Sequence, residues 1–320
     1  MSETINICFA SDDNYAPYFG IAILSILKNA AKEDKFHFYI LDNEISEENK
    51  AKITHFSSQN PFEITWLSFD EKVFEKCGTK NSSWPLSTFG RYLIPELIPA
   101  DKVLYLDCDV MVRGSLAELW KEDLDGYYLA GAPDYNVMWR GKLKERFKGE
   151  MEHPQEYVNA GVLLINNKKW KEEHLFQILL DYSVRNAPFL HWMDQDAINY
   201  ICRKHKKMLP DRYNAMGYLW KPDLIPQGFD VNKVIQEREK VIIRHFHPWK
   251  KNHFIPNRDE YLDLIKQSPW PEVMPKDDPK WLAYFKMTFR YFLRHPYFFF
   301  LPKFWKRLKV RGLDCLIVDY

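Results

Sequence analysis

Two aspartates separated by one residue, Asp107 and Asp109, follow the apolar run from Val103 to Leu106. Such a run is typical of a strand buried on both faces of a parallel sheet. If the strand continues, the two carboxylates project to one face, roughly 6–7 Å apart. They would repel each other and lose hydration there, which favours a cation between them. A divalent cation bound to a phosphate fits this pattern. Alternatively, one aspartate caps the following helix and the other is solvated.

A second polar group lies after the first predicted strand, residues 5–10, in the loop formed by residues 11–15. In open α/β sheets, ligands bind beyond the carboxyl ends of the strands, so this loop is a candidate nucleotide site. Asp12 could accept a hydrogen bond from a base or ribose, Asn14 could bind a phosphate or base, and Tyr15 could stack on a ring. The alternative is a helix N-cap. The chain has no G-x-G-x-x-G or Walker sequence, which argues against a dinucleotide or P-loop site.

Two further segments carry polar groups near predicted strands. Arg91 lies on a predicted helix before the Asp107 strand, either as a surface charge or as a diphosphate contact. Residues 159–161, Asn-Ala-Gly, are predicted to form a small turn before an apolar strand. Small residues allow close approach to a ligand, and the amide of Asn159 suits sugar hydroxyls.

The segment from His191 to Asn199 predicts a helix that runs to about His205, with Asp194 as its N-cap. Capping explains Asp194 but not Gln195, which would face a pocket at the helix N-terminus. The last predicted strand, from Val241, ends at His245. His245 could complete a site with the two aspartates, and two carboxylates with one imidazole suit Mn²⁺ better than Mg²⁺. A structural histidine is the alternative.

Strands predicted near residues 5–10, 36–41, 62–69 and 127–132 are separated by helical segments, which indicates βαβ units and a mostly parallel sheet. The 320 residues, 46% of them hydrophobic, suit one large domain with or without an appendage. A net charge of +1 gives no reason to expect nucleic acid as a partner. Five scattered cysteines, and the lack of a recognisable signal peptide or membrane span, predict a cytoplasmic protein.

Taken together, these segments resemble the retaining glycosyltransferases of family 8, which include bacterial lipopolysaccharide galactosyl- and glucosyltransferases and glycogenin. The resemblance rests on residues 9–15, 102–109, 157–166 and 194–196 and on the segment around His245, in the family's order. It implies a GT-A fold, a uridine diphosphate (UDP) sugar donor, either UDP-glucose or UDP-galactose, and a divalent metal ion, usually Mn²⁺ with Mg²⁺ as the alternative.

The resemblance also implies roles for individual positions. The uridine would be held by Ala10, Asp12, Asn14 and Tyr15, with Arg91 near the donor. The metal ligands would be Asp107, Asp109 and His245, and Asp107 would also contact the ribose. The transferred sugar would contact Asn159, Ala160, Asp194 and Gln195. A lysine would reach the diphosphate: Lys251 matches the family by spacing, but Lys250 follows Trp249 instead of preceding it, and Pro248 replaces the family's glycine, so the choice stays open.

Gln195 matches the family position on the far face of the sugar. Because an amide is a poor nucleophile, front-face attack by the acceptor is favoured, with a covalent intermediate on Asp194 as the alternative. A metal-dependent hydrolase of nucleotide sugars and a catalytically silent binding protein are the rival functions.

The composition changes after residue 267, which predicts a GT-A domain at residues 1–267 and an appendage at residues 268–320. Residues 280–312 contain nine Lys and Arg, no Asp or Glu, and many aromatic residues. This pattern favours an interfacial membrane anchor on the inner face of the cytoplasmic membrane, beside a lipid-linked glycan acceptor. The alternative is a helical hairpin packed on the domain.

Overall fold

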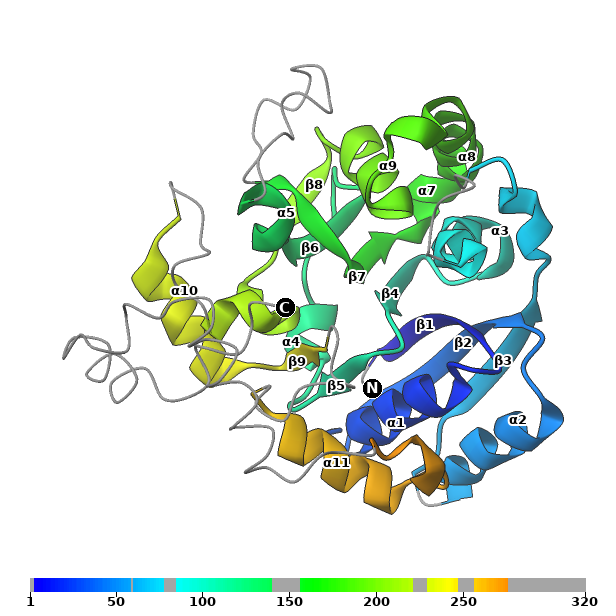
Figure 1. Cartoon of the computed structure of the whole chain (residues 1–320), viewed down its shortest axis with the longest axis vertical. Coiled ribbons are helices and arrows are strands. Elements are labelled where there is room, and N and C mark those ends of the chain that lie inside the picture. Colours follow the sequence, from blue (N-terminus) through cyan, green and yellow to red (C-terminus); the bar gives the residue numbers. More distant parts are fainter. Residues whose placement is uncertain are drawn as a thin grey trace, which may run out of the picture.

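The computed structural model describes residues 3–58, 60–77, 85–139, 156–220, 229–246 and 256–275. Its centre is a seven-stranded sheet in the order β3-β2-β1-β4-β7-β6-β8 (Figure 1). The strands are β1 (Thr4–Asp12), β2 (Lys35–Asn43), β3 (Glu63–Ser68), β4 (Lys102–Leu106), β6 (Leu129–Pro133), β7 (Val158–Asn166) and β8 (Lys206–Met208). A second, two-stranded sheet pairs β5 (Val110–Val112) with β9 (Ile243–His245).

The large sheet is mixed. Strands β3, β2, β1 and β4 run parallel to one another, and β6 runs parallel to β8. Strand β7 lies antiparallel to both β4 and β6. The predicted α/β class with a mostly parallel sheet is therefore confirmed. Strand β7, between β4 and β6, is the strand that runs opposite to the others.

Helices cover both faces of this sheet because its strands are apolar on both sides (Figure 1). Helices α1 (Ala16–Lys28), α2 (Glu47–Thr54) and α11 (Arg258–Gln267) pack on one face, and α3 (Ile94–Leu97), α7 (Asn167–Glu172), α8 (Leu175–Asn186) and α9 (Met193–Ile201) pack on the other. Successive strand residues alternate between these two cores: Ile7 and Phe9 of β1 enter the first, and Cys8 enters the second.

The remaining described helices are short. They are α4 (Ala117–Trp120), α5 (Tyr135–Trp139) and α10 (Val231–Glu237), with 3₁₀ helices at His55–Ser58, Glu71–Phe74, Leu86–Leu93, Ala187–Phe189, Asp211–Tyr213, Gly217–Trp220, Arg238–Lys240 and Pro271–Val273. In the described part of the chain, no helix combines the length and the apolar character that crossing a bilayer requires.

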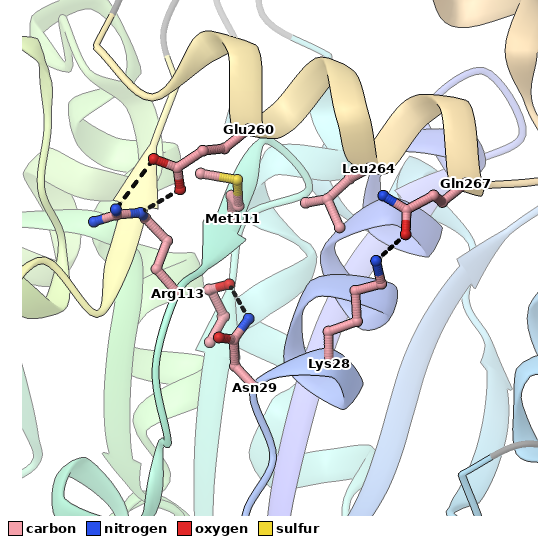
Figure 2. Close-up of a pocket in the computed structure, with 8 residues that line it drawn as sticks. Lys28, Asn29, Met111, Arg113, Glu260, Leu264 and Gln267 are labelled. Atoms are coloured by element: carbon pink, nitrogen blue, oxygen red, sulfur yellow. Dashed lines mark hydrogen bonds and ion pairs between the residues drawn. The ribbon is translucent and has the colours of Figure 1, made fainter.

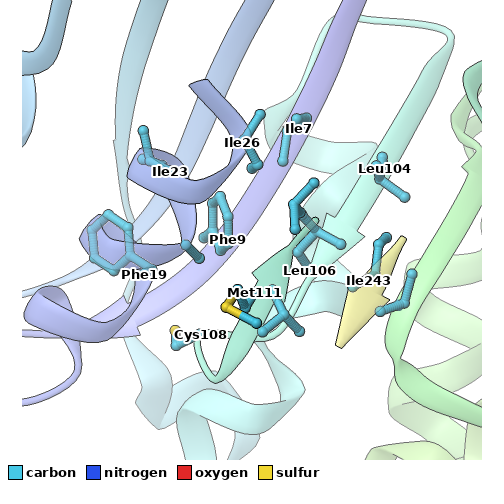
Figure 3. Close-up of a cluster of buried hydrophobic side chains, with 14 of the residues drawn as sticks. Ile7, Phe9, Phe19, Ile23, Ile26, Leu104, Leu106, Cys108, Met111 and Ile243 are labelled. Atoms are coloured by element: carbon cyan, nitrogen blue, oxygen red, sulfur yellow. The ribbon is translucent and has the colours of Figure 1, made fainter. Parts of the chain in front are cut away.

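The small sheet is held against α1 by the first core, which Figure 3 shows in close-up. Phe9 and Phe19 stack with ring centroids 5.7 Å apart, and Met111 of β5 and Ile243 of β9 are buried in the same cluster. The buried hydroxyl of Ser25 on α1 accepts a hydrogen bond from the backbone N–H of Val112 (2.9 Å). Burying each large apolar side chain contributes about 1.5–3 kcal/mol, so this core fixes β5 and β9 relative to β1 and β4.

The packing of the domain continues past Gln267, where its end was predicted. Trp270 is fully buried in the first core, and its indole N–H donates to Asn49 Oδ1 (2.8 Å). Its ring lies directly over Gly20 of α1, where a Cβ atom would come within 2.3 Å of a ring carbon. The tail from residue 276 onward, with its predicted membrane segment, lies outside the described residues, as do Lys250 and Lys251.

Candidate functional site

The segments singled out in the sequence meet at one edge of the large sheet. The parallel strands β1 and β4 end at this edge, and β7 begins there because it runs antiparallel to β4. The backbone N–H of Asp107 donates to Gly161 O (2.8 Å), and Cys108 Sγ donates to Ala10 O (3.4 Å). The antiparallel direction of β7 thus explains why its polar residues precede the strand. The prediction of a turn at residues 159–161 was wrong, since these residues lie within β7.

Asp107, Asp109 and His245 form a cluster that could hold a metal ion. Each offers one ligand atom, and the three atoms lie within 4.8 Å of one another. His245 Nε2 is 3.1 Å from Asp109 Oδ1 and 3.9 Å from Asp107 Oδ2. About a quarter of each aspartate side chain is exposed, whereas His245 is buried. The cluster is therefore open to solvent on its carboxylate side.

Two of these residues lie on the turn between the two sheets, and His245 is the last residue of β9 in the small sheet. Strand β4 ends at Leu106, and the chain turns through residues 107–109 before β5 begins at Val110. The strand therefore does not continue to Asp109, and the condition for both carboxylates to project from one strand face is not met. Val110 is paired with His245 across the small sheet, and Phe246 N donates to Asp109 O (2.9 Å). The turn places one aspartate beside β7 and the other beside β9.

Gly161 lies directly beneath the cluster. A Cβ atom at this position would lie 2.3 Å from His245 Cε1 and 2.6 Å from Asp107 Oδ2. A small residue was expected here for close approach to a ligand. In the structure, the close approach is to the side chains of the cluster itself.

Arg91 is buried and connects two carboxylates. Its Nη2 donates to Asp107 Oδ1 (3.0 Å), and its Nε lies 3.0 Å from Asp194 Oδ2 while donating to Thr88 O (3.2 Å). Burial opposes the charge, but Asp194, Tyr105 and Asp107 together raise the pKa of Arg91 above its usual value. The alternative of a surface charge is therefore wrong.

Asp194 lies inside the first turn of α9, so its prediction as the N-cap was wrong. Trp192 is the N-cap residue, and its backbone N–H donates to Asp196 Oδ2 (2.9 Å). The Asp194 side chain instead accepts from Thr88 Oγ1 (3.1 Å) and pairs with Arg91. Burial raises the pKa of Asp194 to about 6, against the opposing effect of the Arg91 charge.

Gln195 is held at three points. Its Oε1 accepts from Ala160 N (2.9 Å), and its Nε2 donates to Asp134 Oδ2 (3.1 Å) and to Tyr157 Oη (3.3 Å). Asn159 Nδ2 donates to the same oxygen of Asp134 (3.0 Å). The predicted sugar contacts on β7 and α9 therefore lie side by side, with Asp134 between them.

The loop after β1 forms a tight turn. Asp12 Oδ1 accepts from Tyr15 N (2.9 Å), and Tyr15 is the N-cap residue of α1 without a capping side chain. Asp12 therefore caps this turn and not α1. Asn14 is exposed, and 47% of Tyr15 is exposed, with its ring centroid 5.5 Å from that of Tyr18. The ring of Tyr15 and the side chain of Asn14 are therefore exposed at this edge of the sheet.

Sequence reasoning missed three residues of this site. Asn214 Oδ1 lies 2.9 Å from His245 Nδ1, and Tyr105 Oη donates to Asp107 Oδ1 (3.0 Å). Asp134 accepts from Asn159 and Gln195, as described. Asp134 had a signal, because it is a polar residue directly after a predicted strand. Nothing in the sequence around Asn214 marks it, since tertiary packing alone brings it to His245.

A cavity of about 230 Å³ lies elsewhere, between α11, β5 and the C-terminal end of α1 (Figure 2). Its charged groups already have polar partners: Arg113 forms two contacts with Glu260 (2.7 and 3.1 Å), and Lys28 donates to the amide oxygen of Gln267. None of the predicted site residues lines this cavity.

Residues 6–252 match the model of the Glycosyl transferase family 8. The chain belongs to this family. A putative glycosyltransferase of Haemophilus influenzae is 36% identical over 67% of this chain, which spans 64% of that relative's length. A lipopolysaccharide 1,2-glucosyltransferase of Escherichia coli is 28% identical over 85% of this chain and 80% of the relative.

Among solved structures, this glycosyltransferase is similar to the galactosyltransferase LgtC in complex with donor and acceptor sugar analogues. The sequence identity is 26% and the TM-score 0.71, and the match covers 84% of this chain and all of LgtC. The GT-A fold implied by the resemblance is therefore confirmed, and the chain is a glycosyltransferase of family 8.

Proposed function

We propose that this family 8 glycosyltransferase moves glucose or galactose from UDP to a glycan acceptor, with retention of anomeric configuration and with the help of Mn²⁺ or Mg²⁺. The observation that carries the proposal is the convergence of Asp107, Asp109 and His245 at the sheet edge where ligands of α/β proteins bind.

The residues present fit a divalent metal ion. Two carboxylate oxygens and one imidazole nitrogen converge within 4.8 Å, and the missing side chain of Gly161 leaves space for them. An imidazole ligand favours Mn²⁺ over Mg²⁺, which prefers oxygen. When bound, the ion would supply Lewis-acid neutralisation of the charge that builds on the leaving diphosphate.

The chain's own residues would hold the donor on both sides of this cluster. The exposed groups of residues 12–15 suit the uridine, and Asn159, Ala160, Asp194 and Gln195 suit the sugar. The buried charge of Arg91 supports the anionic donor electrostatically, as preorganised charges do in active sites. Lys250 or Lys251 would bind the diphosphate. Both lysines lie outside the residues that the structure describes.

The surroundings of Asp194 and Gln195 favour front-face attack. Both carboxylate oxygens of Asp194 face partners, Thr88 and Arg91, which lowers its strength as a nucleophile. The Gln195 amide is held by Ala160, Asp134 and Tyr157. In the favoured step, the bond from the anomeric carbon to the diphosphate oxygen breaks, a bond to the acceptor oxygen forms, and the acceptor's proton passes to the diphosphate.

The similarity to an enzyme named as a lipopolysaccharide glucosyltransferase supports an acceptor in lipopolysaccharide or surface polysaccharide synthesis. A lipid-linked acceptor would place the enzyme on the inner face of the cytoplasmic membrane, held there by the basic and aromatic residues of the segment 268–320. Co-sedimentation with anionic vesicles tests the proposed membrane attachment. A protein that stays in the supernatant at low salt would contradict it.

The function is tested by UDP release from a panel of UDP-sugars with Mn²⁺, with and without a core oligosaccharide. Wild type and the surface control Asp263→Asn should consume one UDP-sugar, faster with acceptor, and Asp109→Asn should not. A rate of UDP release that is the same with and without the acceptor would instead indicate a hydrolase. UDP binding without turnover of any sugar would indicate a silent binding protein.

A further inference from the structure

A chain of buried polar side chains extends from His245 away from the carboxylates. His245 Nδ1 lies 2.9 Å from Asn214 Oδ1, Asn214 Nδ2 donates to Asn159 Oδ1 (2.8 Å), and Asn159 Nδ2 donates to Asp134 Oδ2 (3.0 Å). All four side chains are buried. Because buried polar groups need hydrogen-bond partners, the donor or acceptor role of each side chain fixes the role of the next one.

The direction of these hydrogen bonds is set at both ends. At Asn159, the backbone N–H of Gly161, which can act only as a donor, meets the Oδ1 atom (3.0 Å). The other end of the same amide faces the carboxylate of Asp134, which accepts. The oxygen of Asn159 therefore faces Asn214, and Asn214 can meet it only with its NH₂ group. The oxygen of Asn214 is left to face His245.

An oxygen beside Nδ1 requires that Nδ1 carry the proton, because a bare ring nitrogen would oppose it. The other ring nitrogen, Nε2, points toward Asp109 and Asp107, so a cation held by these carboxylates would take the lone pair of Nε2 while the proton stays on Nδ1. We infer that Asn214 is a positioning residue that fixes the tautomer and ring orientation of His245 for metal binding. This inference rests on the proposed metal-dependent function, and groups behind a metal ligand commonly have this role.

The same chain reaches the sugar side of the site. Asp134 Oδ2 accepts from both Asn159 Nδ2 and Gln195 Nε2, and Asp134 Oδ1 accepts from Val137 N (3.1 Å). Both oxygens of Asp134 thus face donors. One polar network therefore holds the imidazole on β9 and the amide of Gln195 on α9.

The first test compares Asn214→Ala with Asn167→Ala. Asn167, the first residue of α7, is a matched control. Its side chain is fully buried and donates to two backbone carbonyls, Ile98 O (2.9 Å) and Ala100 O (2.7 Å). Mn²⁺ binding is measured from the EPR signal of free Mn²⁺, with UDP at a fixed concentration. Asn214→Ala should weaken Mn²⁺ binding by about 10–100-fold. Asn167→Ala should bind Mn²⁺ as wild type does, although both variants lose thermal stability.

The second test needs no folded variant of Asn214. Long-range ¹H–¹⁵N spectra of the wild-type protein with Mg²⁺ and UDP report which nitrogen of His245 carries the proton. The resonance is assigned among the ten histidines by its loss in His245→Gln. We expect the proton on Nδ1.

Two results would overturn the inference: a proton on Nε2 in the wild type with Mg²⁺ and UDP, or Mn²⁺ affinity of folded Asn214→Ala within twofold of wild type. A wild type that binds no Mn²⁺ even with UDP overturns the proposed metal function. The role of Asn214 in metal binding is then overturned as well.

Discussion

At the scale of single residues, the site depends on groups that leave space or orient others as much as on groups that bind. Arg91 and Asn214 hold Asp107 and His245 from behind. Gly161 has no side chain, which leaves space for the proposed metal ligands above it. Such supporting residues keep reactive groups in the geometry that catalysis needs, where an error of about 1 Å can cost about 100-fold in rate.

Gly161→Ala should therefore disable the site while leaving the fold intact. The new Cβ atom would overlap His245 Cε1 and Asp107 Oδ2 and push both side chains from their positions. We expect UDP release to fall by about 100-fold. Gly126→Ala is the control: its φ of +77° makes alanine unfavourable, but no atom lies within 4 Å of the new Cβ. If both variants release UDP at similar rates, steric exclusion at Gly161 is not important.

At the scale of elements, two features assemble the site. The antiparallel direction of β7 brings residues 158–161 to the edge where β1 and β4 end. The turn at residues 107–109 joins the large sheet to the small one, where the pairing of Val110 with His245 brings Asp109 close to the imidazole. Helix α1 packs on the small sheet in the first core and so supports the proposed metal site from behind.

The contact between Trp270 and Gly20 stabilises α1 from its outer side. Trp270→Ala should lower the free energy of unfolding by about 3–5 kcal/mol, because it leaves a large cavity in the core. Gly20→Ala should also destabilise the protein, because its Cβ would overlap the indole ring. In the double variant the cavity accommodates the methyl group, so the two effects should not add. Urea unfolding of all four proteins measures this coupling, and simple additivity would contradict the contact.

At the scale of the whole molecule, the fold buries ionisable groups outside the proposed site, and these affect how stability depends on pH. Asp211 is buried beside Tyr135, whose hydroxyl donates to Asp211 Oδ2 (3.0 Å). Burial raises the pKa of Asp211 to about 6 from its ordinary value of 3.8. Between these values the native protein binds more protons than the unfolded chain, so this group lowers stability as the pH rises.

Asp211→Asn should remove that part of the pH dependence. Between pH 4 and pH 7 the wild type should lose up to about 3 kcal/mol more stability than the variant, since each pKa unit corresponds to about 1.4 kcal/mol. The comparison uses the difference between the two pH values, so a constant cost of the substitution cancels. Urea unfolding at both pH values measures it, with the surface variant Asp263→Asn as the control. Equal pH dependence in Asp211→Asn and wild type would contradict the raised pKa.

The local sequence by itself determined the alternation of strands and helices, the mostly parallel sheet and the family. Apolar runs such as Val103 to Leu106 predict buried strands whatever their neighbours are, and polar residues after such runs indicate the ligand-binding edge. The motif order then led to Asp107, Asp109 and His245, which the fold brings together.

Only the tertiary structure decided those features of the site that depend on the direction of a strand in its sheet or on contacts between residues distant in sequence. The prediction of a turn at residues 159–161 failed because a strand's direction in a sheet depends on its partners. The N-cap residue of α9 is Trp192 and not Asp194, because the start of that helix depends on how it meets the chain before it. Asn214 and Gly161 contact His245, a proposed metal ligand, across 31 and 84 positions of sequence, and no local pattern records such contacts.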